Sequence, residues 1–303
     1  MIYGFLILLV ILAYLILRQK KRTSPDKIHP QTPHKWKGIL EQKVLFYQNL
    51  DDAKKAQFES DIYNFLSHVR ITGVQVEVTL EDRLLVASSA VIPLFGFPAW
   101  SYKHLDEVLL YPSSFDRNFN IGSNEEIITG MVGSGAMEGK MILSKPSLHA
   151  GFDITSDKRN VGIYEFVHLF DKENGEIDGI PPGYEHKEYS LPWIDFIHHK
   201  TNKIATNRSD IDGYATTNRQ EFFAVASEYF FERPHLLKKK HPKLYDHLSK
   251  TVQQDMTEVL DSKPPPKKEV GRNDPCPCGS GHKYKSAAWS SIQYILVFVN
   301  STS

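Results

Sequence analysis

The sequence contains very little cysteine: among its 303 residues only Cys276 and Cys278 occur, and both lie near the C-terminus. The main body therefore has no disulfide framework, which excludes a small disulfide-stapled secreted scaffold and is typical of a reducing compartment. An excess of charge is also lacking, because 36 Lys and Arg balance 36 Asp and Glu. This balance gives no overall field that would attract nucleic acid, so we expect no nucleic-acid partner.

Long apolar runs are absent except at the N-terminus. Residues 2–17 are uncharged and apolar, and a basic cluster follows at residues 18–22. As a helix this run spans about 24 Å, and it lacks the basic start and cleavage site of a secretory signal peptide. We predict a single-pass membrane anchor at residues 1–18; a cleaved leader and a membrane-surface helix are the alternatives. The positive-inside rule then places the rest of the chain in the cytoplasm.

The remainder divides into a tether, one folded domain and a C-terminal tail. Prolines and a lack of periodicity predict a tether at residues 19–36. Helical and strand patterns then alternate without a regular period or an internal repeat over residues 37–260, which favours an α+β domain. The predicted C-terminal segments are a Pro- and Lys-rich linker at 261–270, a cysteine-containing motif at 271–285 and a tail at 286–303.

Apolar spacing predicts several elements of this domain. One helix follows Asp51 or Asp52 as its N-cap, and a second begins at Thr79 with an acidic first turn. Runs of strand-forming residues and a glycine-rich segment complete the pattern. The strands are predicted at 74–78, 107–112 and 139–144, and a turn or hairpin at 130–139.

The segment Val161–Asp171, VGIYEFVHLFD, places Tyr164, Glu165 and His168 on one side of a helix. Two side chains one turn apart can reach one metal ion while an adjoining carboxylate activates water. Glu-x-x-His alone is a weak signal, and by itself it is better explained by a core histidine. Asp171 is a candidate to orient the imidazole through a hydrogen bond. A metal site of this kind needs a third donor from elsewhere in the chain.

A second motif, YATTNRQEFFAVASEYFFERP, supplies that donor, because Glu221 begins a periodic helix seven residues after Tyr214. Together the two motifs resemble the Mlc titration factor A family of zinc peptidases, over residues 37–260. The resemblance implies a zincin-like metallopeptidase fold, related to the catalytic domain of anthrax lethal factor, with one zinc ion and a peptide or protein substrate. It also implies His168 and Glu221 as zinc ligands, Glu165 as general base and Tyr214 as the residue that stabilises the transition state.

Tyr164 departs from the family pattern, which has histidine at the first ligand position. A phenol binds zinc well only after losing a proton with a pKa of about 10, although a bound dication would lower that value. Two hypotheses therefore stand. The protein is a membrane-tethered zinc peptidase in which Tyr164 replaces one ligand, or it is a non-catalytic homologue that binds a transcriptional regulator, as the family's sequestration of a repressor implies. His149, near the motif in sequence, is a further candidate neighbour of the site.

The C-terminal segment GRNDPCPCGSGHKYK resembles the zinc-binding motif at the end of the SecA translocase. That motif completes its Cys-x-Cys pair with a second pair of ligands nine and ten residues later. After Cys276 and Cys278, those places hold Ala287 and Ala288. Two thiolates do not close a tetrahedral zinc site, so we predict a degenerate motif that holds no structural zinc by itself. The apolar end of the tail fits either a frameshift or a diverged terminus.

Overall fold

The computed structural model describes residues 33–97, 101–122, 127–154 and 157–260, and in the tail residues 271, 273–276, 283 and 292–293. Residues 33–303 form one compact unit, separate from residues 1–32. The predicted anchor at 1–18 lies outside the described residues. Within the described part, no helix is long and apolar enough to cross a membrane. The mixture of helices and strands confirms the predicted α+β class.

A four-stranded sheet forms the centre of this unit, with the strand order β1-β2-β5-β4. The first three of these strands run parallel, and β4 closes one edge antiparallel to β5. Strands that are covered on both faces are apolar almost throughout, as in β5. The strands are β1 (Arg70–Gly73), β2 (Glu107–Tyr111), β4 (Gly130–Val132) and β5 (Lys140–Ser144), and a second sheet pairs β3 (Ile127–Ile128) with β6 (Ile292–Gln293) in parallel.

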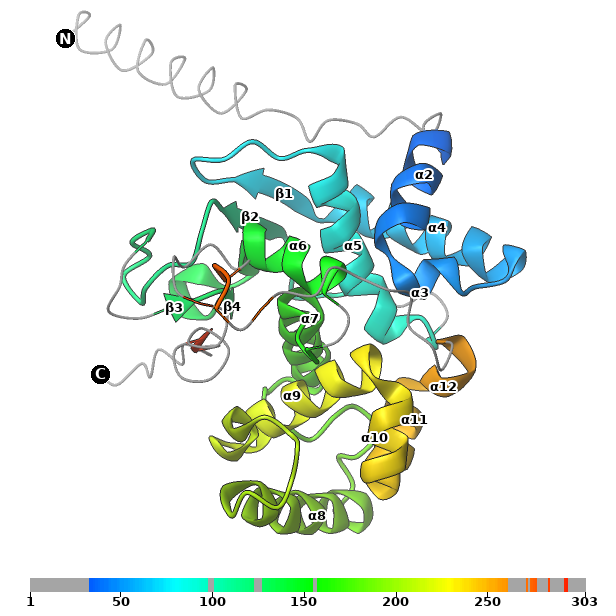
Figure 1. Ribbon diagram of the computed structural model, residues 1–303, viewed down its shortest axis with the longest axis vertical. Helices are drawn as coiled ribbons and strands as arrows, with labels where there is room; N and C mark the ends of the chain where they lie inside the picture. Colours follow the sequence, from blue (N-terminus) through cyan, green and yellow to red (C-terminus); the bar gives the residue numbers. More distant parts are fainter. Residues whose placement is uncertain are drawn as a thin grey trace, which may run out of the picture. The chain divides into compact units, whose positions relative to one another are not determined.

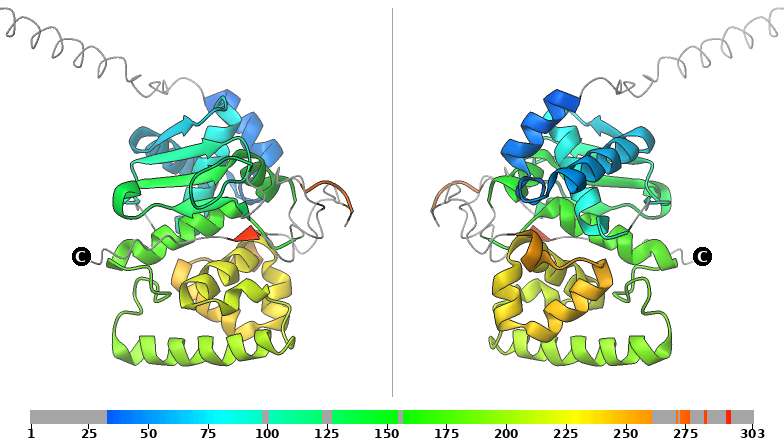
Figure 2. Two further views of the ribbon diagram at one scale, coloured as in Figure 1. Left: turned by 90° about the vertical axis from the view of Figure 1, so that its left-hand side faces the viewer. Right: turned by 90° about the vertical axis from the view of Figure 1, so that its right-hand side faces the viewer.

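Helices surround this sheet in two groups (Figures 1 and 2). Helices α2, α4, α5 and α6 lie beside the sheet in the upper part of Figure 1, α8 to α11 form the lower part, and α7 runs between them. The longer helices are α2 (Pro33–Lys43), α4 (Asp52–His68), α5 (Leu80–Leu94), α6 (Lys145–Asp153), α7 (Val161–Asp171), α8 (Lys187–Ala205), α9 (Arg219–Glu232) and α11 (Pro242–Val252). The shorter ones are α3 (Leu45–Gln48), α10 (Pro234–Lys240), α12 (Met256–Val259) and the 3-10 turns η1 (Gly135–Met137), η2 (Lys172–Asn174) and η3 (Gly213–Thr216).

The two helices predicted near the start of the domain are confirmed, and so are their caps. The Asp51 side chain accepts a hydrogen bond from the backbone amide of Lys54 at the start of α4. Thr79 and Asp82 form a reciprocal capping box at the start of α5. The strands predicted at 107–112 and 139–144 correspond to β2 and β5. Local capping and apolar spacing were therefore sufficient to locate these elements.

The strand predicted at 74–78 is wrong; the strand of this region, β1, ends at Gly73. The chain turns tightly here, with a left-handed φ of 58° at Gln75. A Cβ added at Gly73 would lie 1.9 Å from the carbonyl oxygen of Val76, so the turn requires glycine. The turn or hairpin predicted at 130–139 is confirmed as a hairpin, because β4, its first three residues, pairs antiparallel with β5.

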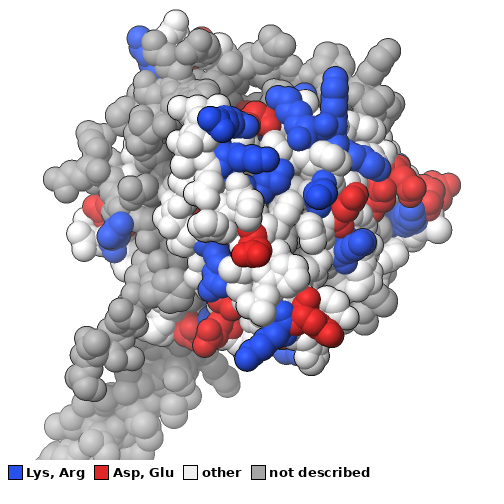
Figure 3. Space-filling model, turned by 90° about the horizontal axis from the view of Figure 1, so that it is seen from below, with Lys and Arg blue, Asp and Glu red and all other residues white. Residues whose placement is uncertain are grey.

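The surface around α8 carries both signs of charge. Seen from below, Lys and Arg side chains gather over part of this face, with Asp and Glu side chains beside them (Figure 3). Lys240 forms an ion pair with Asp210 at 3.0 Å, and Lys238 pairs with Asp255 at 3.5 Å. Asp210 also accepts hydrogen bonds from Lys158, Tyr229 and His241, so its ion pair with Lys240 belongs to a larger network that joins these residues.

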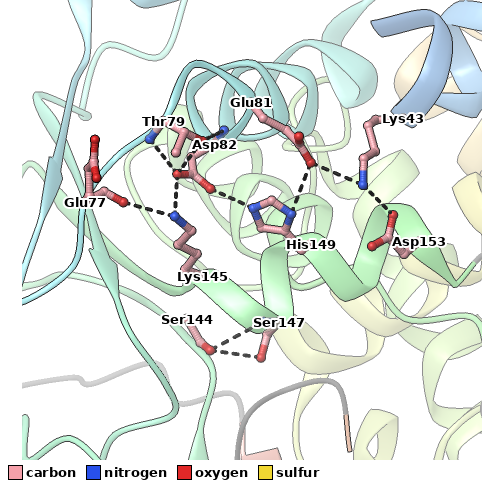
Figure 4. Close-up of polar contacts among 10 residues, drawn as sticks. All are labelled: Lys43, Glu77, Thr79, Glu81, Asp82, Ser144, Lys145, Ser147, His149 and Asp153. Atoms are coloured by element: carbon pink, nitrogen blue, oxygen red, sulfur yellow. Dashed lines mark hydrogen bonds and ion pairs between the residues drawn. The ribbon is translucent and has the colours of Figure 1, made fainter. Parts of the chain in front are cut away.

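A buried ion-pair network joins α5 to α6 (Figure 4). The Asp82 carboxylate is fully buried and accepts hydrogen bonds from Thr79, from Lys145 Nζ at 2.8 Å and from His149 Nε2 at 2.6 Å. His149 Nδ1 also lies 3.4 Å from Glu81. Burial alone would raise the pKa of Asp82, but the hydrogen bonds outweigh it and hold the pKa well below its usual value. His149 is therefore held by the acidic residues of α5.

We expect Asp82→Asn to lower the free energy of unfolding by about 2–4 kcal/mol at pH 7, because Lys145 and His149 would then face a neutral amide. The folded pKa of Asp82 lies below its unfolded value, so this contribution is present at neutral pH and is lost as the pH falls below about 4. Urea unfolding between pH 7 and pH 3 measures both effects. The control is Asp195→Asn, at an exposed position of α8. If the free energies of unfolding of Asp82→Asn and the wild type do not become more similar below pH 4, the stabilising role assigned to ionised Asp82 is wrong.

Candidate metal centre

Helix α7 is held in place at its first turn by two neighbouring helices. The Asn160 side chain caps it by accepting a hydrogen bond from the amide of Ile163 at 3.1 Å, and the Asn160 amide donates to Glu228 of α9 at 2.7 Å. A Cβ added at Gly162 would lie 2.1 Å from Ser89 Oγ, so glycine permits the close approach of α5. Every residue of α7 is buried. Its polar side chains therefore point into the protein interior from a fixed helix.

His168 of α7 and Glu221 of α9 meet in that interior, with exposed side-chain fractions of 1% and 2%. Their Nε2 and Oε2 atoms are 3.5 Å apart, which is longer than an ordinary hydrogen bond. Two ligands at about 2.1 Å from one tetrahedral ion are separated by about 3.4 Å. The pair therefore has a spacing that two ligands of a tetrahedral zinc ion can adopt, and the ligand role that the resemblance implies for these two residues stays a prediction.

Burial controls the protonation of this centre. It lowers the pKa of His168 to about 3, which keeps the imidazole in the neutral form that binds metals. It raises the pKa of Glu221 to about 8. Within the described residues, both ring nitrogens of His168, Glu221 Oε2 and Glu165 Oε1 are buried without a hydrogen-bond partner. Each such atom costs about 1–3 kcal/mol, so a cation bound to His168 Nε2 and Glu221 Oε2 would remove part of this penalty.

Glu165 lies against the edge strand β4. A Cβ added at Gly130 would be 2.5 Å from Glu165 Oε1, so only glycine lets the strand pass over the carboxylate at this distance. Burial raises the pKa of Glu165 well above its ordinary value, and a backbone hydrogen bond from Val132 of β4 opposes that rise. The predicted general base is thus enclosed between α7 and β4, beside His168.

Tyr164 stands one turn before His168 and is fully buried. The two rings meet edge to face, with their centroids 4.7 Å apart. Among the residues that the structure describes, no group of three or more His, Cys, Asp or Glu side chains is arranged to hold a metal ion. The role of Tyr164 as a third metal ligand stays a prediction.

Tyr214 approaches the centre from η3, the turn that precedes α9. Asp212 fixes the start of this turn by accepting a hydrogen bond from the Tyr214 amide at 2.9 Å. Burial, and secondarily the charge of Glu165, raise the pKa of Tyr214 to about 12, while Arg117 acts in the opposite direction. The hydroxyl therefore keeps its proton at neutral pH. The structure thus brings Tyr214 and Glu165 near each other, although they are 49 positions apart in sequence.

Asp171 has a different partner from the one predicted. Its carboxylate accepts a hydrogen bond from the amide of Gly179 at 2.8 Å, and Trp193 Nε1 donates to the Gly179 carbonyl. Gly179 has a φ of 75° and packs against the backbone of Arg219, where α9 begins. Burial raises the pKa of Asp171 to about 7. Asp171 therefore supports the loop beneath the start of α9, and its role in orienting His168 stays a prediction.

Two supporting residues were not found from the sequence. Asn160 carries a recognisable signal, because it occupies the N-cap position immediately before an apolar helix. Glu228 lies seven residues after Glu221, on the same face of α9, and is 2% exposed. An isolated carboxylate in an apolar helix is a signal for a buried hydrogen bond. In the tail, Cys276 is buried, and Cys278 lies outside the described residues.

Comparisons with known proteins show the family of the chain. The family model for glucose-regulated metallo-peptidase M90 matches residues 17–253, and that for the SEC-C motif matches residues 272–286. The chain is 30% identical to an uncharacterised protein of Synechocystis sp., over 73% of this chain and 84% of that protein. It is 28% identical to Mlc titration factor A of Serratia proteamaculans, over 76% of this chain and 92% of that protein. The corresponding protein of Yersinia pestis is 31% identical over 54% of this chain and 65% of its own length.

We expect Tyr164→His to raise zinc affinity at least tenfold, because it adds an imidazole one helical turn before His168, already on the same face. Binding to the folded state alone would raise the melting temperature as zinc is added, by the equivalent of about 2.7 kcal/mol at a zinc concentration 100 times the dissociation constant. Zinc titration and thermal unfolding measure the two effects. Tyr164→Phe, which keeps the ring and removes the oxygen, is the matched control. Unchanged affinity in Tyr164→His would show that His168 and Glu221 are not a metal centre.

Proposed function

This chain belongs to the glucose-regulated metallo-peptidase M90 family. From this premise we infer that the protein is a zinc-dependent peptidase that hydrolyses peptide bonds. The observation that carries the proposal is the buried pair His168 and Glu221, 3.5 Å apart, with the Glu165 carboxylate on the same helix as His168. A neutral imidazole, a carboxylate and an adjoining second carboxylate are the parts that metal-assisted hydrolysis requires. The proposal includes a zincin-like fold for residues 37–260.

His168 and Glu221 would hold the zinc ion, with the oxygen of Tyr164 as the third protein donor. When bound, zinc acts as a Lewis acid that makes water a better nucleophile and polarises the substrate carbonyl. Glu221 has to lose its proton to bind the ion, since burial raises its pKa to about 8. We therefore propose that loading the site releases a proton.

Glu165 performs the proton transfers. Its carboxylate accepts a proton from the attacking water, and the same oxygen can deliver that proton to the nitrogen of the departing amine. Its enclosure between α7 and β4 makes it a stronger base than an exposed carboxylate, because burial raises its pKa. Tyr214 keeps its hydroxyl proton at neutral pH and donates a hydrogen bond to the oxyanion that forms on the peptide carbonyl.

A second candidate function is binding without catalysis. The observation that favours it is Tyr164, since a neutral phenol is a much weaker zinc ligand than the imidazole of the family pattern. Several relatives are named Mlc titration factor A, a name that describes the sequestration of a regulator. In this case the present protein would bind a transcriptional regulator through the same cleft or through its surface. Zinc content and peptide hydrolysis distinguish the two functions.

The Glu165→Gln variant tests the proposed chemistry. We expect it to reduce hydrolysis of a peptide substrate by at least 100-fold while zinc content is unchanged, since it removes only the proton acceptor. The comparison is made in the wild-type protein and in the Tyr164→His variant, where hydrolysis should be greater. Glu176→Gln, at an exposed position beyond α7, is the matched control. A zinc-loaded Tyr164→His protein that hydrolyses no peptide would favour the binding function.

We also propose that residues 1–18 anchor the protein in a membrane, with the peptidase domain facing the cytoplasm. The basic cluster at residues 18–22 supports this orientation. Protease added to intact cells should therefore leave the domain whole, and should digest it only after the cells are opened. An epitope after residue 260, followed by immunoblotting, measures this. Digestion in intact cells would reverse the topology, and recovery of the domain in the soluble fraction would remove the anchor.

A further inference from the structure

We propose that a cavity between α4 and α5 binds a small amine with an apolar body, and that Asp61 binds its ammonium group. The cavity has an empty volume of about 510 Å³, including the part that is open to solvent, which is enough for a small organic molecule. No residue of the metal centre is among the described residues that line it. The inference therefore does not depend on the proposed function.

Helix α4 supplies the polar side of this cavity. Asp61, Asn64 and His68 line it at positions three or four residues apart, so they lie on one face of the helix. Phe65 belongs to the same face and is buried. The cavity therefore has a polar edge at Asp61 and Asn64, next to an apolar interior.

Helix α5 and the segment after it form an apolar wall that is held in place. Val91 and Leu94 are buried there, and Ala90 leaves space because its side chain is small. The Tyr102 hydroxyl donates a hydrogen bond to the carbonyl of Ala90 at 2.9 Å, which attaches the segment after α5 to that helix. This bond preorganises the wall, so a ligand does not have to pay for ordering it.

Aromatic rings line the cavity and connect it to α7. Phe65 and Tyr102 meet edge to face, with their centroids 6.5 Å apart. Both rings also contact Phe166 of α7, at 5.6 and 5.1 Å. Phe97 contacts Phe170 of the same helix at 5.7 Å. Such rings favour an aromatic ligand beside them and a cation above their faces. A ligand here would pack on residues that contact the helix of the metal centre.

The charge of the lining favours an amine. Among the described residues that line the cavity there is no Lys or Arg, and Asp61 is the only Asp or Glu. His68 donates from Nδ1 to the carbonyl of Asn64 at 2.8 Å. Burial raises the pKa of the Asp61 carboxyl, and a hydrogen bond from Gln57 opposes that rise. An ammonium group would act in the same direction as Gln57, because it stabilises the ionised carboxylate. The lining thus favours a cation and disfavours an anion.

Three molecules of similar size test this inference by isothermal titration calorimetry with the full-length protein at pH 7. They are 2-phenylethylamine, which is a cation, 2-phenylethanol, which is neutral, and phenylacetate, which is an anion. We expect the amine to bind at least fivefold more tightly than the alcohol, because its hydrogen bond to Asp61 is charge-assisted. Phenylacetate should bind most weakly.

Two variants locate the ammonium group. Asp61→Asn should remove the preference for the amine over the alcohol, because a neutral amide replaces the carboxylate. Asn64→Lys changes an exposed position on the same face of α4 and should weaken binding of the amine more than that of the alcohol, because it adds a positive charge. The control is Asp52→Asn, at an exposed position of α4 that does not line the cavity, and it should leave the preference unchanged.

The inference is wrong if the wild-type protein binds the amine no more tightly than the alcohol, or binds none of the three molecules at millimolar concentration. It is also wrong if the preference persists in Asp61→Asn, since the amine then binds elsewhere. A preference that is lost in Asp52→Asn as well would show that net charge, and not Asp61, is responsible. The comparison in the wild type needs no variant to fold. None of these results bears on the proposed peptidase, whose residues lie outside the cavity.

Discussion

The complete burial of α7 is the constraint on which the rest of the structure depends. This one helix is packed between α5, α9 and the sheet edge, and it carries Tyr164, Glu165 and His168 into the interior. Its apolar residues supply the hydrophobic contacts that hold these elements together, so the helix cannot rotate to expose its polar side chains. Glycines allow the close packing around α7: Gly130 lets β4 lie against Glu165, and Gly162 lets α5 lie against α7. Glu228 of α9 accepts a hydrogen bond from the amide of Asn160, immediately before the first turn of α7.

The electrostatics of the centre follow from that burial. Without a counter-ion, a buried carboxyl is more stable protonated and a buried imidazole is more stable neutral, which is the state that the raised pKa of Glu221 and the lowered pKa of His168 describe. A dication reverses this preference for the carboxyls and leaves the imidazole neutral. Burial of these polar atoms is unfavourable in the absence of a cation, and the same burial therefore favours the binding of a cation.

Elements with local signals could be predicted from the sequence, whereas contacts between distant segments could not. Helices α4 and α5 were located because their caps and apolar spacing lie within a few residues of each other. The prediction of a strand at 74–78 was wrong because alternating apolar residues also occur in a turn. The close packing at Gly73 and the left-handed conformation of Gln75 produce that turn. His149 was considered near the motif, but its partner Asp82 is 67 residues away. Likewise no local pattern shows that Gly130 lies over Glu165.

The effect of Tyr164 depends on the free energy that burial of the neighbouring polar side chains costs. In an ordinary protein core, replacing Glu165, His168 or Glu221 by an apolar residue of similar size would be neutral or stabilising, because buried polar atoms without partners are unfavourable. These three residues nevertheless retain such atoms in the described interior, and His168 and Glu221 keep the spacing of two zinc ligands. Under the proposed function, a cation bound at His168 and Glu221 would remove part of this energetic penalty. Tyr164 would then change the affinity for that cation and not the place where it binds.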